Sequence, residues 1–147
     1  MIVGIIGAGT MGSGIAQAFA QCEGFEVRLC DITADIAARG KGRIENQLMK
    51  RVAKGKVDEN AARAILCRIA TGTNDICSDC DLIVEAAFES MDVKKQTFEE
   101  LQAIAKPTCI FASNTSSLSI TEIGAKLDRP LVGMHFFNPA PDRKSVV

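Results

Sequence analysis

Short apolar runs and longer stretches with helical spacing alternate along the chain. The apolar runs are typical of buried parallel strands, and they lie at residues 2–6, 25–30, 68–72, 81–88, 109–112 and 131–134. Apolar residues three and four positions apart predict helices between these runs, after residue 12 and over 35–53, 59–67, 91–106 and a short stretch from 119. The alternation predicts an α/β fold with a doubly wound, mostly parallel sheet, and a helical excursion of two helices follows the second strand.

A glycine pattern joins the first strand to the first helix. Gly7, Gly9 and Gly12 form G-x-G-x-x-G directly after the first apolar run. In such a pattern the first glycine allows a tight turn, the second leaves room for a pyrophosphate, and the third lets the helix pack closely on the strand. The helix then directs its unpaired amide N–H groups at the phosphates. The pattern predicts a dinucleotide-binding turn in a Rossmann-like fold.

The second strand ends in an acid, Asp31. This is about 20 residues after the glycines, where a carboxylate holds the adenosine ribose and repels a 2′-phosphate. Charge therefore favours NAD over NADP as the cofactor. The alternative is a glycine turn that binds nothing, with Asp31 capping the next helix; the order of strand, glycines, helix, strand and acid favours the dinucleotide.

Composition narrows the class of protein. The 147 residues have the size of one domain, and 47% hydrophobic with 24% charged residues is typical of globular proteins. A net charge of −1 gives no electrostatic reason for a nucleic-acid or anionic-membrane partner. No apolar run approaches the ~18 residues of a membrane helix, and the chain opens on its first strand instead of a signal peptide. We therefore expect no membrane association and a cytoplasmic location.

Six cysteines without a signal peptide are typical of reduced thiols. Cys30 and Cys109 fall on predicted buried strands, where cysteine behaves as a small hydrophobe. Cys77 and Cys80 form a C-x-x-C motif, but a metal site needs two further ligands, and a redox site needs the motif to open a helix after a strand. We expect structural thiols and no metal site.

Two polar clusters, at residues 113–117 and 135–139, follow predicted strands. Because strand ends meet at the carboxyl edge of a parallel sheet, these clusters are expected to converge. An imidazole suits alcohol oxidation, since it takes the hydroxyl proton while the carbon gives hydride to NAD⁺; His135 is therefore the candidate base. Ser116 or Asn138 is a candidate to hold the oxygen or the cofactor, although such residues also cap turns. The chemistry predicts an NAD-dependent dehydrogenase.

Four segments together resemble a known family. The segments are GAGTMGSGIAQAFA, EAAFESMDVKKQTF, FASNTSSLSIT and VGMHFFNPAP, and they extend the match from residue 1 to about residue 141. They are similar to the short-chain 3-hydroxyacyl-CoA dehydrogenases, in particular to the bacterial 3-hydroxybutyryl-CoA enzymes. The glycine turn is shared with other dehydrogenases, whereas SNTSSLSIT and HFFNP are far more specific.

The resemblance implies roles for individual residues. The segment Gly7, Ala8, Gly9, Thr10, Met11 and Gly12, with Asp31, would bind the adenosine diphosphate part of NAD. Glu89 and Lys94 would contact the cofactor, Asn138 would lie beside the nicotinamide, and Ser116 would touch both cofactor and substrate. His135 would take the 3-hydroxyl proton of an acyl-CoA substrate. Lys54 and Lys56 fall near a lysine that contacts CoA in the family, although a basic run of this kind is as often a solvated helix face.

The tail departs from the family. After HFFNPAP, residues 142–147 read DRKSVV, and Val147 stands where the family has a glutamate paired with the histidine. We expect one NAD-binding domain over residues 1–147, without the family's helical dimerisation domain. His135 would then lack the partner that fixes its tautomer, so we expect little or no turnover.

Two further expectations follow from this departure. The surface that would meet the helical domain is expected to be exposed and apolar, which favours a homo-oligomer. The alternatives to an enzyme domain are a non-catalytic dinucleotide-binding module and a structural protein on the same fold.

Overall fold

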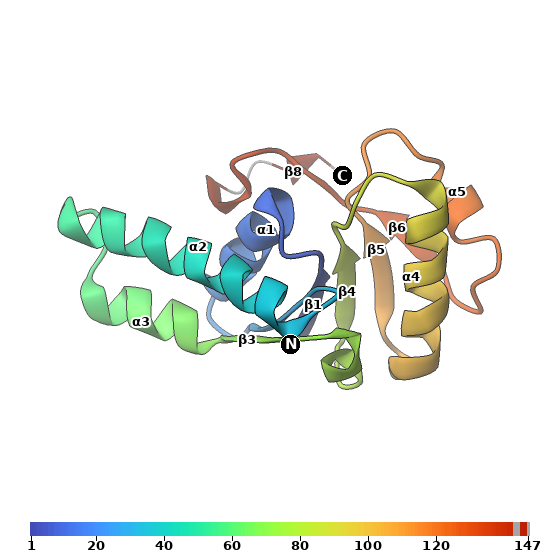
Figure 1. Ribbon diagram of the computed structural model, residues 1–147, viewed down its shortest axis with the longest axis horizontal. Coiled ribbons are helices and arrows are strands. Elements are labelled where there is room, and N and C mark those ends of the chain that lie inside the picture. The colour runs from blue at the N-terminus through green and yellow to red at the C-terminus, as the bar shows by residue number, and fades with distance from the viewer. Residues whose placement is uncertain (143–144, 147) are drawn as a thin grey trace.

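The computed structural model describes residues 1–142 and 145–146, and it is built around one parallel sheet of six strands (Figure 1). The strands are β1 (Ile2–Ile6), β2 (Glu26–Cys30), β3 (Ile69–Gly72), β4 (Leu82–Glu85), β5 (Ile110–Ser113) and β6 (Leu131–Gly133). They are ordered β3-β2-β1-β4-β5-β6, so the chain crosses the sheet between β3 and β4. The gap between the two halves lies at the carboxyl ends of β1 and β4, where doubly wound sheets bind their ligands. The predicted fold class is confirmed.

Helices cover both faces of the sheet (Figure 1). One face carries α1 (Thr10–Ala20), α2 (Ala34–Ala53) and α3 (Glu59–Cys67), and the other carries the 3₁₀ turn η1 (Asn74–Cys77), α4 (Met91–Ile104) and α5 (Ile120–Ile123). The predicted excursion is confirmed, because α2 and α3 lie side by side and extend beyond the sheet. None of the described helices is long and apolar enough to cross a membrane.

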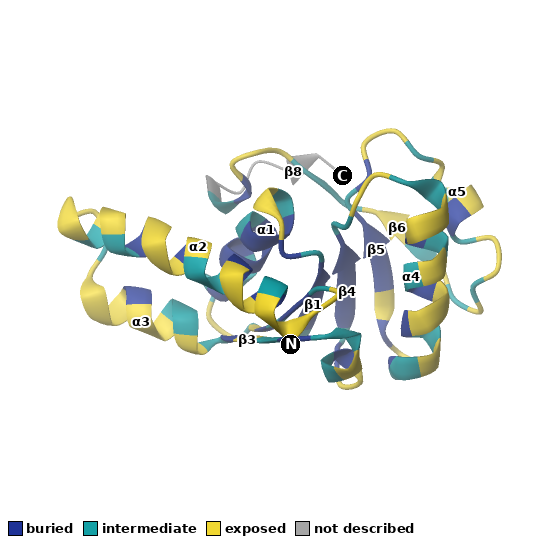
Figure 2. Ribbon diagram, in the orientation of Figure 1, coloured by how far each residue is buried: buried dark blue, intermediate teal, exposed yellow. Residues whose placement is uncertain are grey.

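Two apolar cores result from the alternation of side chains along the strands (Figure 2). On β1, Val3 and Ile5 face the core beneath α1 and α2, whereas Ile6 faces the core beneath α4. The central strands β1 and β4 are buried on both faces, whereas β6 at the edge of the sheet and the outer faces of the helices are exposed. This burial explains why the strands read as continuous apolar runs instead of alternating ones.

Helix starts are set by side-chain caps. Thr33 and Asp58 accept amide hydrogen bonds at the first turns of α2 and α3. Ser119 and Glu122 have the spacing of a capping box at the start of α5, but only half of it is formed. The Ser119 hydroxyl accepts the amide of Glu122, whereas the Glu122 carboxylate binds Lys95 at 2.9 Å instead of reaching back.

Two predicted strands end earlier than expected. β4 stops at Glu85, because the Glu85 side chain accepts the Ala87 amide at 2.7 Å and the chain leaves the sheet; Phe88 is then 78% exposed. β6 stops at Gly133, and the next residues form β7 (His135–Phe136), which pairs antiparallel with β8 (Ser145–Val146). The chain around residue 141 forms a 3₁₀ turn, η2 (Ala140–Asp142).

Glycines let α2 approach the turn between β1 and α1. A Cβ atom on Gly40 would lie 2.7 Å from the Ala8 Cβ and 2.9 Å from the Ala8 carbonyl oxygen, whereas one on Gly42 would meet nothing within 4 Å. Both glycines lie inside α2, so they differ only in what surrounds them.

These two positions give a matched pair of variants. Gly42→Ala should raise the free energy of unfolding by about 1 kcal/mol, because alanine loses less backbone freedom in a helix. Gly40→Ala should lower it by about 1–3 kcal/mol, because the new methyl group overlaps Ala8. Urea unfolding followed by circular dichroism measures both, and equal effects at the two positions would contradict the packing.

Candidate active site

The turn after β1 leaves the start of α1 free to meet a ligand. Gly7 has φ of +100°, and its amide donates to the Cys30 carbonyl oxygen at 2.8 Å. No side chain caps the first turn of α1, whose N-cap is Gly9, and a Cβ atom on Gly9 would meet nothing within 4 Å. Amides without a side-chain acceptor and open space above them suit a phosphate group.

Gly12 has a different task from the one expected. A Cβ atom there would lie 1.7 Å from the Gly7 carbonyl oxygen, but 3.5 Å from the nearest strand side chain, Ile5. The third glycine therefore allows the turn to close on itself more than it allows the helix to approach the strand.

Asp31 lies at the end of β2, next to this turn. Its carboxylate accepts the Ala8 amide at 2.7 Å and the Ile32 amide at 2.8 Å. Asp31 therefore stabilises the glycine turn. A cavity of about 520 Å³ opens beside it, lined in part by Gly7, Asp31 and Asn74. The acid expected to hold a ribose thus faces a space of suitable size.

A second cavity, of about 400 Å³, lies on the other side of Ala87, which lines both. It gathers most of the remaining sequence-predicted residues: Met11, Glu89, Lys94, Ser116, His135 and Asn138. The two polar clusters that follow β5 and β6 therefore converge, as predicted. An extended ligand passing over Ala87 would reach both cavities.

His135 is oriented by a backbone carbonyl. Its Nδ1 lies 3.1 Å from the Asn114 carbonyl oxygen, and because a carbonyl only accepts, Nδ1 carries the proton and Nε2 is left as the basic nitrogen. The Asn114 side chain also accepts the Phe136 amide at 2.7 Å, and the Phe137 ring packs against the imidazole with centroids 5.1 Å apart. The expectation that His135 lacks a partner for its tautomer is wrong. Val147, the residue in the place of the family glutamate, lies outside the described residues.

Lys94 is buried, with 1% of its side chain exposed. Its ammonium lies 2.7 Å from Glu85 Oε1 and 3.2 Å from Glu89 Oε2, and it donates to the Ala87 carbonyl at 3.5 Å. Burial opposes the ionisation of Glu89, but hydrogen bonds from Thr115 and Lys94 outweigh it and hold the pKa of Glu89 below its usual range. Glu89 therefore stays charged at neutral pH.

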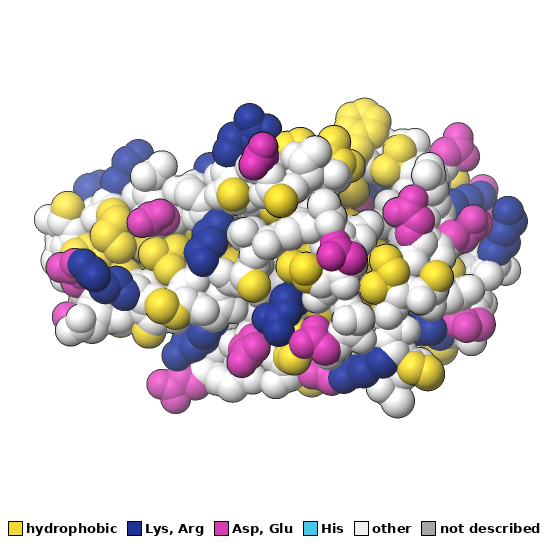
Figure 3. All heavy atoms as spheres, turned by 60° about the horizontal axis from the view of Figure 1, so that its bottom comes forward, with side chains coloured by type: hydrophobic (Ala, Val, Ile, Leu, Met, Phe, Trp, Pro, Cys, Tyr) yellow, Lys and Arg dark blue, Asp and Glu magenta, His cyan; other side chains and the backbone are white. Residues whose placement is uncertain are grey.

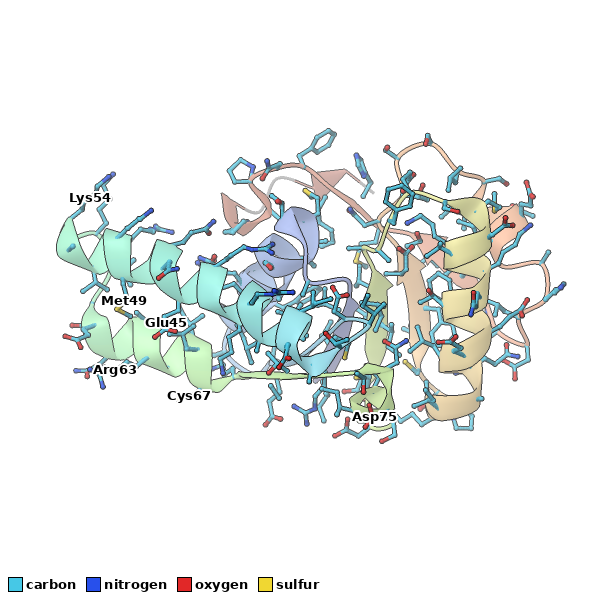
Figure 4. All side chains as sticks on the ribbon, in the orientation of Figure 1. Glu45, Met49, Lys54, Arg63, Cys67 and Asp75 are labelled. Carbon is cyan, nitrogen blue, oxygen red and sulfur yellow. The ribbon has the colours of Figure 1, made fainter. Side chains whose placement is uncertain are left out.

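Neither of the two lysines expected to contact CoA lines either cavity. Lys54 caps the end of α2, and Figure 4 places it at the tip of the α2–α3 hairpin, pointing away from the sheet. Lys56 is in the exposed turn that follows. On the face seen in Figure 3, basic and acidic side chains are interspersed and form no continuous basic area.

Four of the six cysteines are buried in the domain, whereas Cys22 is half-buried and Cys67 is exposed. Cys30, Cys77, Cys80 and Cys109 are buried, and Cys30 and Cys77 have sulfur atoms 3.4 Å apart. Hydrogen bonding to neighbouring thiols and burial raise the pKa of Cys77 and of Cys80 above the usual range, and burial raises that of Cys109 to about 11. Within residues that the structure describes, no group of three or more potential ligands is placed to hold a metal ion.

The sequence does not single out two residues that support this edge. Ser113 and Asn114 count only as members of the polar cluster 113–117, although both support the site. Glu85 ends β4 at this edge and is fully buried. A serine and a glutamate paired across two adjacent strand ends, in register at Glu85 and Ser113, is the signal that would have found them.

The fold and this edge define the class: an α/β domain of an oxidoreductase that uses NAD. The family model for the NAD-binding domain of 3-hydroxyacyl-CoA dehydrogenase matches residues 2–146, and the chain belongs to that family.

Relatives agree with this assignment. A 3-hydroxybutyryl-CoA dehydrogenase of Bradyrhizobium diazoefficiens is 46% identical over 142 residues, which are 95% of this chain and 48% of the relative. One of Clostridioides difficile is 44% identical over 149 residues, covering 99% and 53%. The crystal structure of (S)-3-hydroxybutyryl-CoA dehydrogenase from Ralstonia eutropha superposes with a TM-score of 0.90 at 40% identity, covering 95% and 50%. The chain spans about half the length of these relatives.

Asp31 gives a test of cofactor choice. Asp31→Asn keeps an oxygen that accepts the Ala8 amide but removes the charge that repels a 2′-phosphate. We expect NADH affinity to fall about tenfold, the value of one charge-assisted hydrogen bond, and the preference for NADH over NADPH to shrink. Calorimetric titration with both cofactors measures this.

The matched control is Asp35→Asn, an exposed acid in the first turn of α2. It should leave both affinities unchanged. An unaltered NADH to NADPH ratio in Asp31→Asn would show that Asp31 serves the turn alone.

Proposed function

We propose that this chain is the cofactor half of a dehydrogenase that interconverts 3-hydroxyacyl-CoA and 3-oxoacyl-CoA, with 3-hydroxybutyryl-CoA and acetoacetyl-CoA as the substrate pair. NAD, when bound, accepts or returns the hydride at the substrate's C3. The observation that carries the proposal is the second cavity, in which Ser116 and the oriented His135 lie together beside the glycine turn. The resemblance of HFFNP and SNTSSLSIT to the acyl-CoA enzymes supports this substrate class over a free 3-hydroxy acid.

Each residue of the proposed site has a stated task. The turn from Gly7 to Gly12, with Ala8, Gly9, Thr10 and Met11, holds the pyrophosphate on the uncapped start of α1. Asp31 holds the ribose, and Glu89, Lys94 and Asn138 shape the nicotinamide end of the second cavity. Ser116, which is exposed at the rim of that cavity, donates to the oxygen on C3 of the substrate.

His135 acts as the general acid and base. With Nδ1–H held by the Asn114 carbonyl, Nε2 takes the proton of the 3-hydroxyl group as C3 loses hydride, and it returns the proton in the reverse direction. The imidazolium formed in the oxidation carries a full charge, and a carbonyl stabilises it less than a carboxylate does. His135 is thus well oriented but weakly supported in the charged state.

For the same reason, the chain alone is proposed to have little or no turnover. Phe137 lines the second cavity beside His135 and is 47% exposed, so the described residues leave that side of the cavity open. Other exposed apolar residues, Ile110 and Val132, lie on adjacent strands and support the proposal of a homo-oligomer.

The test combines binding and turnover in the same samples. We expect NADH to bind in calorimetry, with little acetoacetyl-CoA-dependent loss of NADH absorbance, because the proposed cofactor-binding residues lie together while the second cavity is open beside Phe137. His135→Gln should bind NADH as the parent does and should abolish whatever turnover is present.

The outcomes separate the candidate functions. Failure to bind NADH would reject the cofactor half and leave a structural protein on the same fold. Binding with no turnover, even in a chain joined to the second half of a relative, would favour a non-catalytic dinucleotide module.

Lys54 and Lys56 are proposed to attract the phosphates of CoA. Changing both to alanine should weaken CoA binding about two- to fivefold, the range for an exposed charge, and leave NADH binding unchanged. Lys126→Ala serves as control, because Lys126 is also exposed and is 80% accessible at its side chain. Equal CoA affinity in both variants, measured by calorimetry, would place the lysines on a solvated helix face.

A further inference from the structure

The buried ion pair behind the second cavity connects the two segments that carry Ser116 and His135. Glu85 is fully buried, and its carboxylate accepts three hydrogen bonds: from the Ala87 amide and the Lys94 ammonium, each at 2.7 Å, and from the Ser113 hydroxyl at 2.6 Å. These donors belong to the loop after β4, to α4 and to β5. Three parts of the carboxyl edge therefore meet at one side chain.

One branch of this network leads to His135. Ser113 donates to Glu85 and accepts the Thr115 amide at 3.3 Å, so the backbone on both sides of Asn114 is fixed. The Asn114 amide also donates to the Glu85 carbonyl at 2.8 Å. The Asn114 carbonyl is thereby aimed at Nδ1 of His135.

The other branch leads to Ser116. Lys94 pairs with Glu85 on one side and with Glu89 on the other. Glu89 in turn accepts hydrogen bonds from the Thr115 and Ser117 hydroxyls, the two neighbours of Ser116. Ser116 therefore sits at the centre of a segment held from both sides by one carboxylate.

Lys94 links the elements behind the cavity. Its ammonium lies 2.7 Å from Glu85 and 3.2 Å from Glu89, and the Ala87 carbonyl oxygen is 3.5 Å away. Lys94 lines the second cavity and also joins α4 to the end of β4 and to the loop after it.

We propose that Glu85 and Lys94 are positioning residues: they fix the orientation of the His135 ring and the place of the Ser116 segment, so that both side chains face the second cavity. This inference rests on the proposed function, since it assigns the task of aligning the proton acceptor with the group that holds the substrate oxygen. Neither residue reaches the substrate; both act through Asn114 and Glu89.

The principal variant is the double substitution Glu85→Gln with Lys94→Met. It removes both buried charges together, so it should fold, whereas Lys94→Met alone leaves a buried carboxylate without its cation and should melt at a lower temperature. Ser113→Ala removes only the branch to His135. Lys95→Met is the control, because Lys95 is the next residue of α4 but pairs at the surface with Glu122.

The chain contains one histidine, so nitrogen-15 NMR reports the tautomer of His135 without ambiguity. The parent and Lys95→Met should show the Nδ1–H form at alkaline pH. The double variant and Ser113→Ala should show a mixture of tautomers, and the double variant should bind NADH about tenfold more weakly, the equivalent of one charged hydrogen bond. A loss of stability alone would not change the tautomer of the folded protein.

The result that would overturn the proposal is a double variant and a Ser113→Ala variant that keep the Nδ1–H form and an NADH affinity within twofold of the parent. If the parent itself does not bind NADH, the proposed function fails, but the tautomer measurement still decides whether Glu85 and Lys94 position His135.

Discussion

The rest of the structure depends on how closely four elements pack around the turn between β1 and α1. Gly7 could not carry a side chain, since a Cβ atom would lie 2.6 Å from the Ala86 carbonyl oxygen at the end of β4. Gly12 closes the same turn from α1, and Gly40 brings α2 against Ala8. With the ends of β1, β4, α1 and α2 at contact distance, both cavities open at a single edge and share Ala87 as their common wall. The backbone around Ala87 therefore fixes how far apart the two cavities lie.

The order of elements was predictable from the sequence because a strand buried on both faces leaves a continuous apolar run. The ends of strands were not. Residues 86–88 are apolar and extend the run of β4, yet the chain turns out of the sheet there because the Glu85 carboxylate binds the Ala87 amide. That contact depends on where a side chain lies in three dimensions, and periodicity does not report it.

The site was predictable where a residue type in that position rarely has a purely structural role. Glycines in a fixed spacing, an acid at a strand end and a single histidine pointed to the two cavities. Lys94 shows the limit of this reasoning. Its charge suggests contact with a ligand, and helical spacing alone puts the apolar Val93 on the same side of α4 as Phe98 and Leu101. In the structure Lys94 takes that inward position, four and seven residues before the two apolar side chains, and Val93 is 39% exposed. The burial of Lys94 could be predicted only by knowing that Glu85 and Glu89 lie within reach of its ammonium.

The partner of His135 separates two tasks that a carboxylate would perform together. A histidine base must be held in one tautomer, and its cation must be stabilised once it has taken the proton. The Asn114 carbonyl, 3.1 Å from Nδ1, performs the first task, and its dipole only partly performs the second. No carboxylate forms an ion pair with His135 among the side chains described. The low turnover proposed for this chain therefore follows from the weak stabilisation of the His135 cation and from the open second cavity. The orientation of the base is already provided by Asn114, a residue of this domain.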